Sequence, residues 1–213
     1  MLELVAAPDI AFIKEGERLA VRRGHVGIDA LLGPDRDWVG KWFDGRTSQS
    51  VEFVISLSPR LMAKWAGFAG RREGRDAGDV WEEVDQFAET PHFVIALAAY
   101  PRMRTFDLFE QVPPDPEPIE DFTVVLVRAG GEERLAVREL GYVRGRARRD
   151  TDGFDWWSAV RYDLPPLRRG LFGDFHRSYF LAIGETPIAP GEKYEVHIYS
   201  DRRTRVARLT WPN

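Results

Sequence analysis

The chain of 213 residues contains no cysteine. Disulfide bonds, thiolate metal sites and cysteine nucleophiles are therefore excluded. No apolar run reaches the roughly 18–20 residues that a membrane-spanning helix needs, so we expect no membrane span. The N-terminal stretch lacks a basic start and a long apolar segment, and so is not an intact signal peptide. We expect a cytoplasmic protein if Met1 is native, and a periplasmic or extracellular one if the chain is a processed form.

The chain also lacks a surplus of basic charge, because its formal net charge is −4. Nucleic-acid binding needs a basic footprint, so we expect no nucleic-acid partner. Lysine is scarce, with 4 residues against 26 arginines. Scattered arginines are typical of a GC-rich bacterial genome, although planar guanidinium groups also suit phosphate or carboxylate recognition.

The common catalytic and cofactor motifs are missing. The sequence has no phosphate loop, dinucleotide fingerprint or nucleophile elbow, and its four histidines show no zinc-binding spacing. His92 and His197 lie in or beside expected strands, where a partly buried, hydrogen-bonded imidazole is the usual case. We therefore expect no cofactor and favour a non-catalytic role, while leaving enzymatic activity open.

What the sequence does contain is alternating apolar and polar residues in short runs bounded by Gly, Pro and Asp. This pattern predicts antiparallel strands packed as a β-sandwich of immunoglobulin-like architecture. Residues 10–23 are predicted as a hairpin turning at Lys14 to Gly16, residues 121–140 as a second turning at Gly130-Gly131, and residues 193–211 as a third turning near Asp201. Single strands are expected at 51–57, 92–100 and 177–184.

A short helical insert is predicted around residues 58–90. Ser58 followed by Pro59 is the usual chemistry of a helix start. A second start is predicted at Asp79, with Glu82 three residues later as in a capping box. Val80, Val84 and Phe87 then share one apolar helix face, with Trp81 beside them.

The proline-rich stretch at residues 112–118 is the strongest candidate boundary, because four prolines in seven residues cannot continue a sheet or a helix. It predicts a β-sandwich unit at 1–112 with the helical insert, a linker at 113–118 and a second sandwich unit at 119–213. The alternative is a single large sandwich domain covering 1–213, with this stretch as a loop.

The hexapeptide ERLAVR occurs twice, at residues 17–22 and 133–138. Each copy is interpreted as the returning strand of a hairpin, and similar features follow both copies in the same order. We therefore consider a diverged tandem duplication of one sandwich unit. Coincidence between two strands of similar composition is the alternative.

Residues 149–157 (RDTDGFDWW) suggest one candidate metal site. Asp150, Asp152 and Asp155 offer carboxylates to a hard cation such as calcium. The spacing differs from that of an EF-hand loop, because the glycine comes too early and the closing glutamate is missing. The alternative is a hairpin turn, since Asp-Gly supplies the positive φ of a tight turn.

Tryptophans supply the candidate contact residues. Trp38 and Trp42 lie in a ring-rich stretch with loop-like composition, and Trp157 is expected to face away from the core because its neighbour Trp156 faces into it. We expect a non-catalytic protein-binding or assembly module that uses these three residues. A glycan-binding or glycan-hydrolysing module that uses the same aromatics with the Asp150–Asp155 loop is the alternative.

Overall fold

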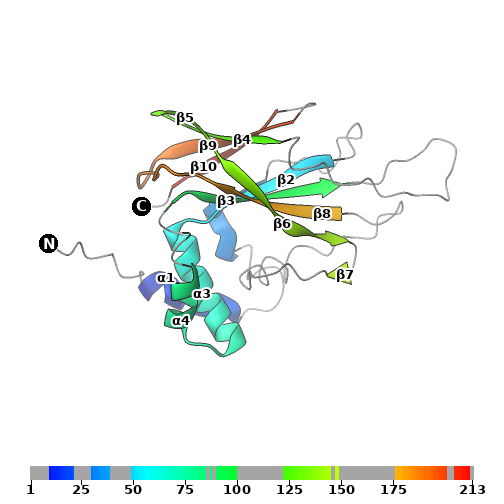
Figure 1. Ribbon diagram of the computed structural model, residues 1–213. Coiled ribbons are helices and arrows are strands. Elements are labelled where there is room, and N and C mark those ends of the chain that lie inside the picture. Colours follow the sequence, from blue (N-terminus) through cyan, green and yellow to red (C-terminus); the bar gives the residue numbers. More distant parts are fainter. Residues whose placement is uncertain are drawn as a thin grey trace.

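The computed structural model describes residues 10–21, 30–38, 49–84, 87, 90–99, 122–144, 147–148, 176–200 and 204–211. These residues form two antiparallel sheets with helices on one side (Figure 1). The mainly β, sandwich-like architecture that the alternating pattern predicted is thus confirmed. Among these residues, no helix is both long enough and apolar enough to cross a membrane.

The larger sheet contains six strands in an order that mixes early and late parts of the chain. In spatial order they are β1 (Arg36–Trp38), β2 (Gln49–Ser56), β3 (His92–Ala99), β8 (His176–Ile183), β6 (Ala136–Arg144) and β7 (Ala147–Arg148). The predicted single strands at 51–57, 92–100 and 177–184 correspond to β2, β3 and β8. At the centre of the sheet β3 pairs with β8, with Ile95 opposite Phe180.

The smaller sheet contains β10 (Thr204–Thr210), β9 (Lys193–Tyr199), β4 (Thr123–Arg128) and β5 (Gly131–Arg134). The strand pairs of two predicted hairpins are confirmed here, since β4 pairs with β5 and β9 pairs with β10. The return strand of the first ends at Arg134 instead of continuing to residue 140, and the turn predicted near Asp201 lies outside the described residues. The first turns at residues 129–130, and Gly131 follows with a φ of 133°, which favours glycine.

The two sheets pack face to face over an apolar core that includes Phe93, Leu126 and Val196. The opposite face of the six-stranded sheet carries a second core, which includes Phe53, Ile55 and Leu181 and lies against the helices. A bulge between Val51 and Phe53 shifts the register of β2. The shift lets Val51 and Val54 share one core while Phe53 and Ile55 share the other.

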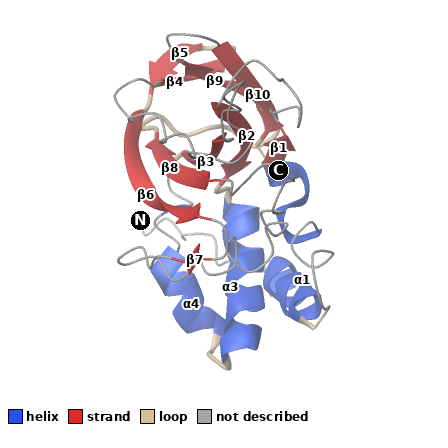
Figure 2. Cartoon of the chain, turned by 90° about the vertical axis from the view of Figure 1, so that its right-hand side faces the viewer, coloured by secondary structure: helices blue, strands red, loops and turns tan. Residues whose placement is uncertain are grey.

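The edges of the two sheets approach each other, so the strands follow one another around a common interior (Figure 2). On one side, Asp37 of β1 accepts a hydrogen bond from the backbone amide of Arg208 in β10, with an Oδ2–N distance of 2.7 Å. On the other side, the chain leaves β5 at Leu135 and enters β6 of the opposite sheet. The amide of Leu135 still donates to the Val124 carbonyl of β4.

The helical layer consists of α1 (Ile10–Ala20), α3 (Pro59–Glu73) and α4 (Ala77–Val84). The predicted insert is confirmed, because α3 and α4 connect β2 to β3. Pro59 is the first residue of α3, and Ser58 Oγ accepts a hydrogen bond from the Leu61 amide at 3.2 Å. Val80, Val84 and Phe87 are all buried on one side, as the spacing predicted.

The predicted start of the second helix was three residues late. Helix α4 begins at Ala77, and Asp76 Oδ1 accepts a hydrogen bond from the Gly78 amide at 2.7 Å. Asp76 therefore caps the helix, and Asp79 lies within its first turn. Both aspartates are of a residue type that caps helices, and the hydrogen bond to the Gly78 amide identifies Asp76 as the cap.

The hairpin predicted for residues 10–23 is wrong, because Ile10–Ala20 is a single helix. Phe12, Gly16 and Leu19 lie on its inner side, at the three- and four-residue spacing of a helix. Gly16 was interpreted as a turn residue, but it lies at the contact with α3. A Cβ on Gly16 would lie 1.9 Å from the Lys64 carbonyl oxygen, and one on Gly67 would lie 2.0 Å from that of Ile13.

The proline-rich residues 112–118 lie outside the described part of the chain, so the predicted linker stays a prediction. The six-stranded sheet nevertheless combines β2 and β3 from one side of that stretch with β8 and β6 from the other. Both the two-unit division and the single-domain alternative stay predictions.

Candidate functional site

The four-stranded sheet has one face in the core and one face directed outward. On β9, Tyr194, Val196 and Ile198 are buried, so the residues between them point away from the core. The same alternation on β10 buries Ala207 and Leu209. We call the outward side chains of this sheet the open face: Thr123, Val125, Val127, Glu132, Arg134, Lys193, Glu195, His197, Tyr199, Thr204, Val206, Arg208 and Thr210.

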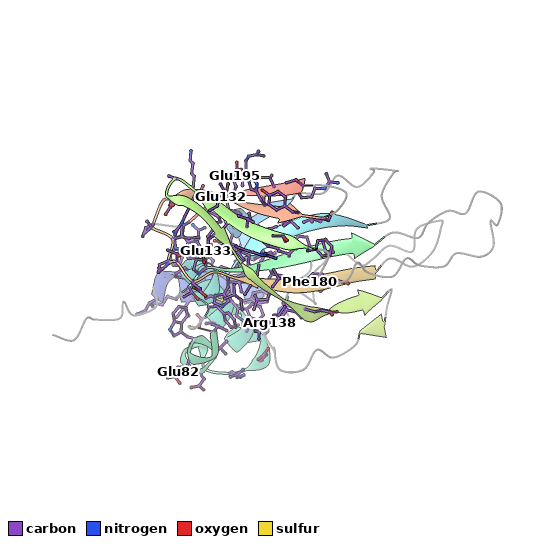
Figure 3. All side chains as sticks on the ribbon, turned by 45° about the horizontal axis from the view of Figure 1, so that its top comes forward. Glu82, Glu132, Glu133, Arg138, Phe180 and Glu195 are labelled. Atoms are coloured by element: carbon purple, nitrogen blue, oxygen red, sulfur yellow. The ribbon has the colours of Figure 1, made fainter. Side chains whose placement is uncertain are left out.

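No helix or strand of the described part packs over this face (Figure 1). Figure 3 shows Glu132 and Glu195 on this side of the molecule, with Glu82 of α4 on the opposite side. The six-stranded sheet differs, because the helical layer covers its outer face. Among the residues that the structure describes, the open face is therefore a broad sheet surface that no other element covers.

Cross-strand pairing brings the side chains of the open face into rows. His197 lies opposite Val125 of β4 and Val206 of β10, so an imidazole stands between two aliphatic groups. In the next row, Glu195 lies opposite Val127 and Arg208. Directly opposite residues in antiparallel strands are close enough for their side chains to contact one another.

Four polar side chains of the open face form a continuous chain of contacts. Arg208 Nε donates to Glu195 Oε1 at 3.0 Å, and Glu195 Oε2 lies 2.7 Å from His197 Nε2. His197 Nδ1 in turn lies 3.2 Å from the Tyr199 hydroxyl. We call Arg208, Glu195, His197 and Tyr199 the polar row.

The polar row holds its glutamate in the ionised form. The hydrogen bond with His197 lowers the pKa of Glu195, and the nearby Arg208 guanidinium lowers it further. Arg208 is itself positioned from a third strand, since Asp37 accepts the hydrogen bond of its backbone amide. Tyr199, at 36% exposure, is one of the large apolar-bodied side chains that the described part leaves exposed.

A second polar cluster is buried at the start of α3. Asp35 is 2% exposed, and its Oδ1 accepts a hydrogen bond from Ser58 Oγ at 2.6 Å. Its Oδ2 accepts one from Arg60 at 3.1 Å. Burial raises the pKa of Asp35, although Ser58 and Arg60 oppose that effect. Because the carboxylate is enclosed and both oxygens are occupied, this cluster fixes the helix start rather than meeting a ligand.

An apolar recess lies between the two sheets. Ile95, Leu97, Phe122, Val124, Val137, Phe180 and Ile198 line it. Its walls expose no polar atoms, and its free space is close to the minimum needed for a single water molecule. It is therefore a packing imperfection of the core and offers no prepared site for a ligand.

The site residues predicted from the sequence fall largely outside the described part of the chain. This holds for Trp42, Trp157 and the three aspartates Asp150, Asp152 and Asp155. Trp38 belongs to β1, where its backbone pairs with Phe53, and its side chain is not described. The proposed contact and calcium roles of these residues therefore stay predictions. Within the described ranges, no group of three or more His, Asp or Glu side chains is arranged to hold a metal ion.

The polar row was not identified from the sequence, although a signal for it exists. Glu195, His197 and Tyr199 alternate with buried residues on a strand that was itself predicted. Their shared face follows from that alternation, whereas the contribution of Arg208 depends on the register with β10. His197 was expected to be a partly buried, hydrogen-bonded strand residue, and its contact with Glu195 and a side-chain exposure of 20% confirm this.

No family model, curated protein or solved structure matches this chain.

Proposed function

We propose that this protein is a non-catalytic β-sandwich module that binds another protein through the open face. The observation that carries the proposal is the combination of the polar row, which includes Tyr199, with three partly exposed valines on a sheet face that no described helix or strand covers. Protein interfaces commonly combine an apolar centre with tyrosine and arginine side chains. The polar groups of the row already bind one another, which suits a binding surface better than a reacting centre.

The charges of the open face indicate what kind of partner surface it fits. Val125, Val127 and Val206 form its apolar centre, whereas Arg134 and Lys193 lie near its borders. In the described part of the chain, neither of these cations has an ion-pair partner. The face carries three cations, Arg134, Lys193 and Arg208, against the anions Glu132 and Glu195. The whole chain is acidic, so this face is locally biased toward a partner with carboxylates around an aliphatic patch.

The alternative is a glycan-binding module. The exposed ring of Tyr199 beside hydrogen-bonding side chains also suits stacking against a sugar. Hydrolysis of a glycan through the Asp150–Asp155 loop stays a prediction, because that loop lies outside the described residues. Neither proposal depends on an immunoglobulin-like strand order or on tandem units, which also stay predictions.

Site-specific photo-crosslinking tests the proposal with a pair of matched positions. A photoreactive residue is placed at Val206 on the open face, and in a second variant at Val21, which is 68% exposed beside α1. Each variant is expressed in the native host, irradiated and analysed for adducts. We expect one discrete protein adduct from position 206 and none of that mass from position 21. We also expect Arg134→Glu combined with Lys193→Glu to abolish the adduct.

Three outcomes would count against protein binding. Equal adducts from both positions would indicate random collision, and an adduct unchanged by the charge reversals would remove the argument for a carboxylate-bearing partner. The third outcome is that no protein adduct forms while the pure protein binds immobilised glycans. If Tyr199→Ala abolishes that glycan binding, the glycan alternative replaces the proposal.

A further inference from the structure

The hydrogen positions in the polar row follow from the chemistry of its members. An ionised carboxylate can only accept hydrogen bonds, so His197 Nε2 must carry the hydrogen that joins it to Glu195 at 2.7 Å. In the neutral ring Nδ1 is then an acceptor, and the Tyr199 hydroxyl donates to it. In this state the hydroxyl hydrogen of Tyr199 is used inside the row and is not offered to a partner.

Protonation of His197 reverses the last of these bonds. With a hydrogen on both ring nitrogens, Nδ1 becomes a donor and the Tyr199 oxygen becomes its acceptor. The hydroxyl hydrogen of Tyr199 then rotates outward. The same event adds one positive charge between Val125 and Val206, at the centre of the open face.

We propose that His197 is a proton-operated switch of the open face, which at acidic pH releases the Tyr199 hydroxyl as an outward donor and makes the face more positive. The charged and titratable groups around it are Glu195 and Tyr199 on β9, Arg208 on β10 and Arg134 on β5, with Asp37 of β1 behind Arg208. On β4, Val125 lies directly opposite the ring, and its same-face neighbours Thr123 and Val127 are uncharged. Because Glu195 accepts a hydrogen bond from the ring in both states, the imidazole keeps its position while the Tyr199 hydroxyl changes from hydrogen-bond donor to acceptor.

The effect of this switch on partner binding rests on the proposed function. The reversal of the hydrogen bond between His197 and Tyr199 does not. A partner that presents carboxylates would gain both a hydrogen-bond donor and a favourable charge when His197 is protonated. A charge-assisted hydrogen bond of this kind changes affinity by about tenfold. We therefore expect tighter binding at pH 5.5 than at pH 7.5.

Nuclear magnetic resonance of the intact 213-residue chain tests the switch without any partner. Long-range ¹⁵N–¹H spectra of the imidazoles are recorded between pH 5 and pH 8, together with the ¹³Cζ signal of Tyr199. We expect His197 to be the Nε2–H tautomer at high pH, and the Tyr199 signal to shift with the same midpoint as the His197 ring. In His197→Gln the Tyr199 shift should vanish, and in Glu195→Gln the Nδ1–H tautomer should appear.

An Nδ1–H tautomer at high pH in the wild-type protein, or a Tyr199 signal that ignores the His197 titration, would overturn the switch. A separate arm repeats the crosslinking at position 206 at both pH values, with His197→Gln as the control. A yield that rises about tenfold at pH 5.5 only when His197 is present supports its use in binding. If no adduct forms at either pH the proposed function fails, and the spectra still decide whether the switch exists.

Discussion

At the scale of single residues, the Asp35 carboxylate links the chain just before β1 to the beginning of α3. It accepts hydrogen bonds from Ser58 and Arg60, which are more than 20 residues away in sequence. Ser58 Oγ in turn accepts the Leu61 amide, so one short network fixes the direction in which the helix leaves the sheet. Removal of the carboxylate would leave the buried Ser58 hydroxyl and the partly buried Arg60 guanidinium without this acceptor.

We expect Asp35→Ala to lower the free energy of unfolding by about 3 kcal/mol, because removing one partner of a buried polar network leaves the others unsatisfied. Urea unfolding followed by tryptophan fluorescence measures this. The control is Asp79→Ala, which removes an exposed carboxylate in the first turn of α4 and should cost within about 0.5 kcal/mol. Similar losses in both variants would contradict the structural role given to Asp35.

His92 provides a pH-dependent prediction. The ring is 9% exposed, its Nδ1 lies 2.8 Å from the Thr90 carbonyl, and Phe87 packs edge-on at a centroid distance of 5.1 Å. Burial lowers the pKa of His92, and the charge of Arg138 adds to that effect, although the Thr90 carbonyl opposes it. The folded protein therefore holds this ring neutral at pH values where the unfolded chain already binds a proton.

As the pH falls below the unfolded value of about 6.5, the unfolded chain takes up the proton first, so stability should decrease until the folded pKa is reached. We expect the free energy of unfolding to fall between pH 7.5 and pH 5.5. The fall should be smaller in His92→Gln, whatever the stability of that variant at pH 7.5. Urea titrations at three pH values give the slopes, and equal slopes would rule out a contribution from His92.

Sequence reasoning at the residue scale succeeded where partners are close in the chain. Ser58 and Pro59 were identified as a helix start because the capped amide lies only three residues away. The role of Asp35 could not be found in this way, since its partners are distant and nothing in its neighbourhood marks it as buried. The polar row lies between these cases, because three of its members share one strand and the fourth depends on strand register.

At the scale of elements, the contact between α1 and α3 depends on two glycines. Gly16 faces the backbone of α3 at Lys64, and Gly67 faces the backbone of α1 at Ile13. Lys64 Nζ also binds Glu15 Oε1 at 2.9 Å beside this crossing. Backbone approaches this close leave no room for a Cβ, so the sequence must place glycine at both positions despite its cost in a helix.

We expect Gly16→Ala and Gly67→Ala each to lower stability by about 1–3 kcal/mol, because the helices must move apart. In an isolated helix the same change would raise stability by about 1 kcal/mol, so the sign of the effect is diagnostic. Thermal unfolding by circular dichroism measures it. Gly130→Ala is the control, since a Cβ there meets nothing within 4 Å. Stabilisation by either helix substitution would show that the two helices do not cross this closely.

The repeated hexapeptide shows why local sequence did not decide the elements. Residues 17–20 of the first copy are helical, whereas the second copy covers the end of β5, Leu135 and the beginning of β6. Leu19 and Leu135 are both buried, but in different cores. In the first copy Leu19 is 6% exposed whereas Val21, two residues later, is 68% exposed. Tertiary packing, and not the six residues, determines which structure each copy forms.

At the scale of the whole molecule, the alternating pattern was sufficient to predict layered antiparallel sheets, but not how the strands are shared between them. The sequence of a buried strand such as β3 does not indicate which other strand will pair with it. The pairing of β3 with β8 therefore could not be foreseen. The division of the chain at residues 113–118 depends on composition alone and stays a prediction. The open face could not be predicted for the same reason, because it is defined by which sheet faces the other described elements cover.

This topology predicts how the chain behaves when divided. We expect fragments 1–112 and 119–213, expressed separately, to lack a cooperative unfolding transition, because each removes a hydrogen-bonded neighbour from the central strands. The full chain should unfold in a single transition. Calorimetry and urea titration of the three proteins test this. Independent cooperative folding of either fragment would support the two-unit division.

The central pairing also has a consequence for synthesis on the ribosome. Strands β2 and β3 are made early, yet β8, the second neighbour of β3, is translated about 80 residues later. At the usual synthesis rate of about 5–20 residues per second, this edge of β3 stays unpaired for several seconds until β8 has been made. During that interval the nascent chain exposes one unpaired strand edge, which is the kind of surface that holding chaperones bind.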